Sequence, residues 1–242
     1  MMAKPSYVSG PSDVPLLGET IGDNLDRVAA EHPDVPCLIS RHQRLSWTYA
    51  EFLRAVDECA RAFLALGVTR GERVGMWSPN RAEWGVVQYA TAKIGAILVN
   101  INPAYRTHEL EYALGQSGTS VLVSASSFKT SDYASMIGEV RPKLPELREV
   151  ILLDDPSWKS FLARASSVPA SDLRARQATL QFDDPINIQY TSGTTGFPKG
   201  ATLSHHNILN NAYASTGIQR LGRGDRLCVP VPLYHCFGMV LG

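Results

Sequence analysis

The spacing of apolar residues switches between a helical period and a strand period from residue 20 to residue 125. The first helical segment ends at His32-Pro33, because proline does not continue a helix. The inner face of this helix is formed by Ile21, Leu25, Val28 and Ala29. Two short apolar runs follow at residues 37–39 and 45–47, and we predict that they pair as strands across a polar turn.

Thr48 and Glu51 have the spacing of a capping box, in which each side chain bonds the backbone N–H of the other residue. The helix that they open is predicted to end at Gly67, since glycine favours the position after a helix. Its apolar residues recur at helical spacing and form one inner face. They are Phe52, Val56, Cys59, Ala60 and Phe63.

Beyond residue 70, apolar runs of strand length alternate with single helical segments. Strands are predicted at residues 73–77, 96–99, 120–124 and 150–153, with helices at residues 81–94 and 107–116 and another before the last strand. Such an alternation implies parallel strands with right-handed helical crossovers. We therefore predict an α/β fold in which mostly parallel sheets are flanked by helices. Residues 154–184 are richer in Pro, Ser, Ala and charge, and are predicted to be a looser connection.

The region after residue 185 has the pattern of two short strands joined by a loop. A strand-like run at residues 186–190 precedes the loop, and an apolar run at residues 201–203 follows it. Ser204 is placed to cap a helix that begins near His205. The loop and its borders read Thr191, Ser192, Gly193, Thr194, Thr195, Gly196, Phe197, Pro198, Lys199 and Gly200.

The composition of this loop suits a polyphosphate. Gly193, Gly196 and Gly200 permit positive φ and leave no Cβ between backbone N–H groups and anionic oxygens. The hydroxyl groups donate hydrogen bonds, and Lys199 supplies a mobile positive charge. The loop is not a Walker A motif, which requires Gly-Lys-Ser/Thr at the start of a helix. A flexible surface turn is the alternative. The concentration of glycines and hydroxyl residues with one lysine in ten positions favours phosphate binding.

This segment resembles the phosphate-binding signature of the adenylate-forming superfamily, which includes acyl-CoA synthetases, firefly luciferase and nonribosomal peptide adenylation domains. The longer run over residues 187–211 is most similar to medium-chain-type fatty acyl-CoA synthetases, and residues 232–238 resemble the motif that begins their acyl pocket. Residues 71–74, 79–80 and 102–103 also match family positions. The resemblance implies that residues 1–242 are part of an N-terminal adenylation (AMP-binding) domain, without the C-terminal lid domain.

The resemblance implies a reaction in two steps. A carboxylate attacks the α-phosphate of ATP to give acyl-AMP and pyrophosphate, and the CoA thiolate then displaces AMP. Donors on the phosphates offset the repulsion between the two anions. The resemblance assigns the β- and γ-phosphates to residues 191–199, a catalytic role to Lys199, and a contact with Mg²⁺ to Thr191. ATP, Mg²⁺, CoA and a medium- to long-chain fatty acid are the implied ligands.

His235 resembles the family residue at the mouth of the acyl site, where an imidazole can contact or gate the carboxylate. The resemblance therefore gives it a catalytic and substrate-binding role, with Phe237, Gly238 and Met239 at the border of the acyl channel. A histidine packed in an apolar segment is the alternative. A metal site made by Cys228, His235 and Cys236 is disfavoured, since adjacent residues converge poorly on one ion.

The remaining features exclude several classes of protein. His205-His206 is interpreted as the exposed N-terminus of a surface helix. The chain of 242 residues is 44% hydrophobic, which excludes a disordered protein, and its formal net charge of +0 argues against a nucleic-acid binder. The longest apolar run, at residues 94–99, is shorter than the roughly 20 residues of a membrane span. Without a secretory leader or a CxxC pair, we expect a cytoplasmic protein with free thiols.

The apolar end of the chain, residues 233–242, leads us to expect a piece of a longer enzyme that is inactive alone. The resemblance places a magnesium-binding glutamate, a ribose-binding aspartate and a catalytic lysine in a mobile domain further along such an enzyme. Two alternatives stay open. One is a short nucleotide- or partner-binding protein without enzymatic activity. The other is an adenylating enzyme for an amino or aryl acid that uses a carrier-protein acceptor.

Overall fold

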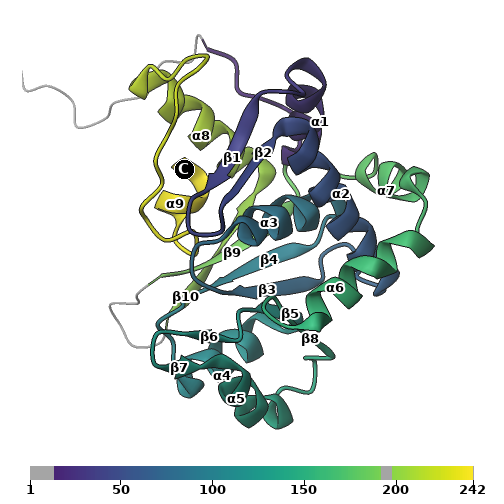
Figure 1. The fold of residues 1–242 in the computed structure, drawn as a ribbon, viewed down its shortest axis with the longest axis vertical. Coiled ribbons are helices and arrows are strands. Elements are labelled where there is room, and N and C mark those ends of the chain that lie inside the picture. Colours follow the sequence, from purple (N-terminus) through teal and green to yellow (C-terminus); the bar gives the residue numbers. More distant parts are fainter. Residues whose placement is uncertain (1–13, 192–197, 242) are drawn as a thin grey trace, which may run out of the picture.

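The structure is a computed structural model that describes residues 14–191 and 198–241. A six-stranded sheet lies at its centre, with the strands in the order β10-β9-β4-β3-β5-β8 (Figure 1). β9 and β10 are antiparallel, and the other neighbouring strands are parallel. The strands are β3 (Arg73–Trp77), β4 (Ile97–Ile101), β5 (Thr119–Ser124), β8 (Glu149–Leu152), β9 (Pro185–Thr191) and β10 (Lys199–Ser204).

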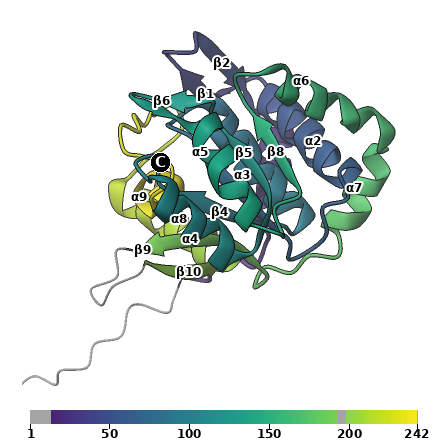
Figure 2. The ribbon, with the colours of Figure 1, turned by 90° about the horizontal axis from the view of Figure 1, so that it is seen from below.

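Helices cover both faces of the sheet, because alternate strand residues point to opposite sides. Val74 and Met76 face the layer of α2 and α3, while Val99 and Ile101 face the layer of α4 and α5. Figure 2 looks onto α4 and α5, with the sheet behind them. The helices are α1 (Ile21–Glu31), α2 (Tyr49–Ala65), α3 (Ala82–Ile94), α4 (Thr107–Ser117), α5 (Tyr133–Val140), α6 (Pro156–Ala163), α7 (Ala170–Gln177), α8 (His205–Gln219) and α9 (Cys236–Leu241).

This arrangement confirms the predicted α/β fold with a mostly parallel sheet. Two small antiparallel pairs complete it: β1 (Pro36–Ser40) with β2 (Leu45–Thr48), as predicted, and β6 (Ser127–Phe128) with β7 (Ser131–Asp132). Within residues 14–191 and 198–241, no helix is both long and apolar enough to cross a membrane.

The start and the inner face of α2 follow the sequence prediction. The Glu51 N–H donates to Thr48 Oγ1 at 3.2 Å, and the Thr48 N–H donates to Glu51 Oε2 at 2.9 Å, which completes the capping box. Gly67 follows the helix with φ of 80°, in the left-handed region that glycine adopts without strain. All five predicted inner residues are buried: Phe52, Val56, Cys59, Ala60 and Phe63.

The prediction of a loose connection over residues 154–184 is wrong, because this segment contains α6 and α7. Asp155 caps α6 by accepting the N–H of Ser157 at 2.8 Å. Phe161 in α6 and Leu173 in α7 are buried against the core that α2 lines. Each helix buries one large apolar residue, so the sequence contains no hydrophobic period, and packing on α2 stabilises the segment.

The prediction that His205 lies at the surface is also wrong. Its side chain is fully buried in the first turn of α8, and its Nδ1 accepts the N–H of Ile21 at 3.2 Å. Burial lowers the pKa of His205 to about 4. The contact joins α8 to the start of α1, which is remote in sequence, so no local pattern could reveal it. His206 is only partly exposed and packs beside Phe182.

The buried imidazole predicts that stability depends on pH. The pKa of His205 is about 4 in the folded chain and 6.5 ordinarily, so the unfolded chain binds the proton more readily between these values. The contribution of the neutral, buried imidazole to the free energy of unfolding is fully present above pH 6.5 and is lost as the pH falls towards 4. It amounts to about 1–3 kcal/mol. His205→Gln should flatten this slope in urea titrations run across that pH range. His206→Gln, the matched control, should retain the slope, and an unchanged slope in His205→Gln contradicts the assignment.

Candidate functional site

The predicted phosphate loop leaves the sheet at the end of β9 and returns at the start of β10. Thr191 lies directly opposite Lys199 in the antiparallel register, and the Thr191 hydroxyl is 3.4 Å from the Lys199 carbonyl oxygen. Both residues are exposed. The hairpin thus brings the first and last predicted ligands together at its neck. The remaining predicted ligands before Pro198 lie outside the described residues: Ser192, Gly193, Thr194, Thr195, Gly196 and Phe197.

Lys199 keeps its charge accessible at this neck, since it forms no ion pair with any residue that the structure describes. Gly200 does not adopt the positive φ expected of it, because it is part of the extended strand β10. A Cβ on Gly200 would lie 3.0 Å from Cγ2 of Ile188, so glycine here allows a close approach to β9.

Helix α4 supports the neck through two tyrosines that the sequence analysis missed. The Tyr112 hydroxyl donates to the Pro198 carbonyl at 3.1 Å, and the Tyr190 hydroxyl donates to the Ala113 carbonyl at 2.9 Å. The two rings meet edge to face, with centroids 6.5 Å apart. Burial raises the pKa of Tyr190 to about 12, so this donor remains protonated. The residue before Lys199 is therefore fixed against α4.

His235 precedes α9 and is exposed. Its Nδ1 accepts the N–H of Phe237 at 3.2 Å, and the Sγ of Cys236 lies 3.8 Å from the same nitrogen. A ring nitrogen that accepts a hydrogen bond carries no proton, so in the neutral imidazole this contact assigns the proton to Nε2. The exposed edge of His235 thus presents an N–H donor.

Asparagine side chains hold the segment before His235 on the carboxyl edge of the sheet. Asn80, which follows β3, donates to the Val231 carbonyl at 2.8 Å and accepts the Leu233 N–H at 2.8 Å. Asn100 in β4 donates to the Leu233 carbonyl at 3.4 Å, and Asn187 in β9 donates to Asn100 Oδ1 at 3.0 Å. A chain of amides therefore links β9, the strand that ends at Thr191, to the His235 segment.

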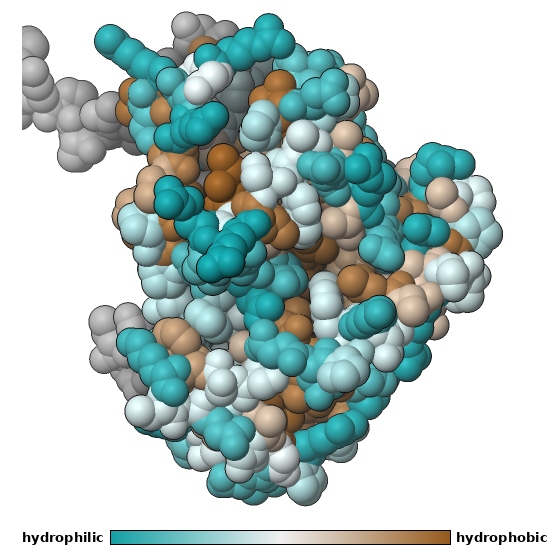
Figure 3. Space-filling model, in the orientation of Figure 1, coloured by the Kyte–Doolittle hydropathy of each residue, from teal (hydrophilic) through white to brown (hydrophobic). Residues whose placement is uncertain are grey.

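A cavity of about 520 Å³ lies between α8 and α9. Phe237 lines it and is 54% exposed, whereas Gly238 and Met239 are buried and do not line it. Met239 packs with Ile21 and Ile208, and a Cβ on Gly238 would lie 2.4 Å from the Pro232 carbonyl oxygen. Hydrophobic surface continues beside α8 and α9 (Figure 3). The cavity lining is mostly apolar and consists of Leu203, Asn207, Ile208, Asn211, Cys236, Phe237, Val240 and Leu241.

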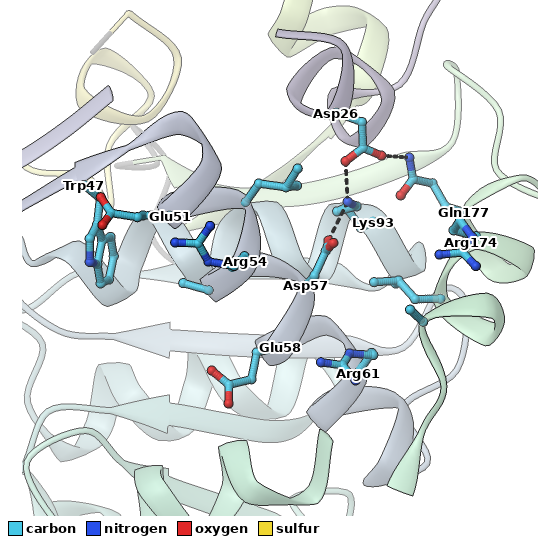
Figure 4. A pocket seen from close by; sticks show the side chains of 14 residues that line it. Asp26, Trp47, Glu51, Arg54, Asp57, Glu58, Arg61, Lys93, Arg174 and Gln177 are labelled. Atoms are coloured by element: carbon cyan, nitrogen blue, oxygen red, sulfur yellow. Dashed lines mark hydrogen bonds and ion pairs between the residues drawn. The ribbon is translucent and has the colours of Figure 1, made fainter. Parts of the chain in front are cut away.

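A larger cavity, of about 930 Å³, lies beside α2 and α7 and is not lined by any predicted site residue. The buried Lys93 ammonium reaches both Asp26 and Asp57 at 2.6 Å, and Gln177 donates to Asp26 at 2.8 Å (Figure 4). The acidic and basic residues of the lining are equal in number. Because Lys93 is already paired, we interpret it as a structural link between α1, α2 and α3.

The residues that the structure describes do not form a complete magnesium site. In the part of the chain that the structure describes, no group of three His, Cys, Asp or Glu side chains could hold a metal ion. Thr191 contributes one exposed hydroxyl, whereas Mg²⁺ usually takes carboxylate oxygens together with substrate phosphates and water. An ion at the hairpin neck would therefore depend mainly on nucleotide phosphates.

Known proteins resemble the chain over almost its whole length. The medium-chain acyl-CoA ligase ACSF2 of Danio rerio is 43% identical over 98% of this chain, which aligns with 42% of that ligase. The inhibitor-bound N-terminal domain of FACL13 from Mycobacterium tuberculosis superposes with a TM-score of 0.79 at 28% identity, covering 92% of this chain and 54% of that one. The anthranilate CoA ligase AuaEII, solved with anthranoyl-AMP, gives a TM-score of 0.79 at 26% identity, covering 95% and 43%.

The chain thus spans less than half the length of the Danio rerio ligase. The family model described as "AMP-binding enzyme" matches residues 25–242, which include the hairpin neck, the asparagine chain and the His235 segment. The chain therefore belongs to the AMP-binding enzyme family.

Proposed function

We propose that this chain supplies the phosphate-binding and acid-binding parts of an ATP-dependent acyl-CoA synthetase. The observation that carries the proposal is the joining of the Thr191–Lys199 neck, through the asparagine chain, to the His235 segment and its apolar cavity. The Danio rerio relative is named as a medium-chain acyl-CoA ligase, which supports this reaction class.

In the first step an oxygen of the carboxylate forms a bond to the α-phosphorus of ATP, and the bond to pyrophosphate breaks. Lys199 and the loop donors bind the β- and γ-phosphates, so positive charge lies where the leaving pyrophosphate gains negative charge. The carboxylate itself attacks, so no protein nucleophile is required. In the second step the CoA thiolate attacks the acyl carbon, and AMP leaves.

His235 serves in this proposal as a donor and not as a general base. Its Nε2–H binds the carboxylate or the acyl phosphate, while the Phe237 N–H holds Nδ1 and fixes the ring. The alkyl chain of the acid enters the cavity at Phe237, with Gly238 and Met239 as buried support. Thr191 would contact the Mg²⁺ that accompanies ATP, and this ion would add positive charge beside the phosphates.

A medium- to long-chain fatty acid is the proposed substrate, because the cavity lining is mostly apolar. An aryl acid is the second candidate, supported by the likeness to the anthranilate CoA ligase AuaEII.

We further propose that residues 1–242 alone bind ATP weakly and are inactive, because the chain spans 42% of the Danio rerio ligase. The cytoplasmic location stays a prediction, and the Danio rerio relative is named as a mitochondrial ligase.

Lys199→Ala, made in the full-length gene product, should slow acyl-adenylate formation by about 10²–10³-fold, because one donor to the leaving charge is lost. Pyrophosphate release with octanoate or decanoate measures the rate, and anthranilate tests the aryl alternative. Lys159→Ala is the matched control, since Lys159 is an exposed lysine on α6. Equal rates for Lys199→Ala and the control would refute the role of Lys199. No release by the unaltered protein with any acid would refute the reaction class.

His235→Ala should lower kcat/KM for the acid by about tenfold, because one hydrogen bond to a charged group is lost. The KM for ATP should change little. His235→Gln, which retains an N–H donor, should recover part of the loss. His206→Ala on α8 is the control. A loss that falls on ATP instead of the acid would assign His235 to the nucleotide.

A further inference from the structure

We propose that Asn80 is a positioning residue of the acid site, because it fixes the backbone of residues 231–233 and thereby the place of His235. The inference rests on the proposed function. The side-chain amide of Asn80 acts as a peptide group would in a strand: Nδ2 donates to the Val231 carbonyl, and Oδ1 accepts the Leu233 N–H, both at 2.8 Å. Asn80 touches neither substrate in this proposal and acts through the segment that it holds.

The segment needs such a support because it has little structure of its own. Residues 220–235 join α8 to α9 without any helix or strand, and most of their side chains are exposed. The backbone of residues 231–233 is held by the Asn80 and Asn100 side chains. Two hydrogen bonds from a half-buried amide therefore replace the strand pairing that would otherwise fix this backbone.

The buried amides beneath this segment extend the support to the phosphate loop. Asn100 and Asn187 are each 1% exposed in the middle of the sheet, where burial of an apolar side chain would cost less desolvation free energy. Asn100 bonds both the Leu233 carbonyl and Asn187, and Gln189 lies opposite Asn100 in the register. Because Asn187 shares β9 with Thr191, the chain of amides fixes the His235 segment relative to the hairpin neck.

This coupling matters for the proposed reaction because the carboxylate must approach the α-phosphorus in line with the leaving group. Displacements of about 1 Å in such a reaction cost on the order of 10²-fold in rate. The carboxylate end is held by His235 and the leaving phosphates by the hairpin. Asn80 and the buried amides keep these two binding elements at a constant separation.

Asn210 provides a control for the experiment, because its side-chain amide also donates to a backbone carbonyl and accepts a backbone N–H of a segment that is remote in sequence. Its Oδ1 accepts the Leu17 N–H at 2.7 Å, and its Nδ2 donates to the Leu17 carbonyl at 3.0 Å. Asn210 Nδ2 also donates to the His206 carbonyl at 3.0 Å, so Asn210→Ala removes one bond more than Asn80→Ala does, in a different part of the fold. The Asn210 clamp holds the segment before α1 and lines neither the cavity nor the hairpin neck.

The first measurement is amide hydrogen exchange of the full-length protein, followed by mass spectrometry of peptides. Asn80→Ala should accelerate exchange in residues 231–241 by about tenfold or more, because the loss of two hydrogen bonds makes local opening easier. Asn210→Ala should leave that peptide unchanged and accelerate residues 14–20. Unchanged exchange over residues 231–241 in Asn80→Ala overturns the proposal.

The second measurement is steady-state adenylation kinetics. Asn80→Ala should lower kcat/KM for the acid by about tenfold while the KM for ATP stays within about twofold. Faster exchange with unaltered acid kinetics overturns the positioning role. If Asn80→Ala unfolds, Asn80→Asp, which keeps the acceptor for the Leu233 N–H, should give intermediate exchange and kinetics, and values equal to the unaltered protein overturn the proposal. Absence of adenylation by the unaltered protein refutes the proposed function but leaves the exchange result to decide whether Asn80 fixes the segment.

Discussion

The parallel pairing of β4 with both β3 and β9 is the constraint on which the rest of the site depends. Parallel strands present their carboxyl ends at one edge of the sheet, so residues that follow different strands meet there. Asn80 follows β3 and Thr191 ends β9, although they are far apart in the sequence. The same edge then receives the segment that carries His235, through the Asn80 bonds. The sheet thus determines which side chains can act together.

Buried polar groups join distant parts of this fold where apolar contacts alone would not fix a single arrangement. Lys93 links α3 to Asp26 of α1 and Asp57 of α2, and His205 links α8 to the start of α1. The Asn100–Asn187 pair does the same within the sheet. A buried polar group that loses its partner has a large desolvation cost. Alternative arrangements of the helices and strands that break these bonds are therefore disfavoured.

The fold and the hairpin could be predicted because their signals are local. The capping box of α2 and the strands on either side of the loop are encoded within a few residues of one another, and each was found where predicted. The helices over residues 154–184 could not be predicted, because each depends on one buried side chain packed against α2. Tyr112 was missed, and Asn80 was noted only as part of a family-like pair without a role, because the partners of both side chains are remote in sequence.

The hairpin also shows how a lysine outside a helix can be positioned for the proposed phosphate contact. In a loop that opens a helix, the helix N-terminus supplies fixed N–H donors. Here the chain returns as a strand, so the position of Lys199 depends on the register between β10 and β9. A slip of one residue would turn its side chain to the other face of the hairpin. The bonds from Tyr112 to Pro198 and from Tyr190 to Ala113 oppose such a slip, and α4 thereby determines the side on which the ammonium lies.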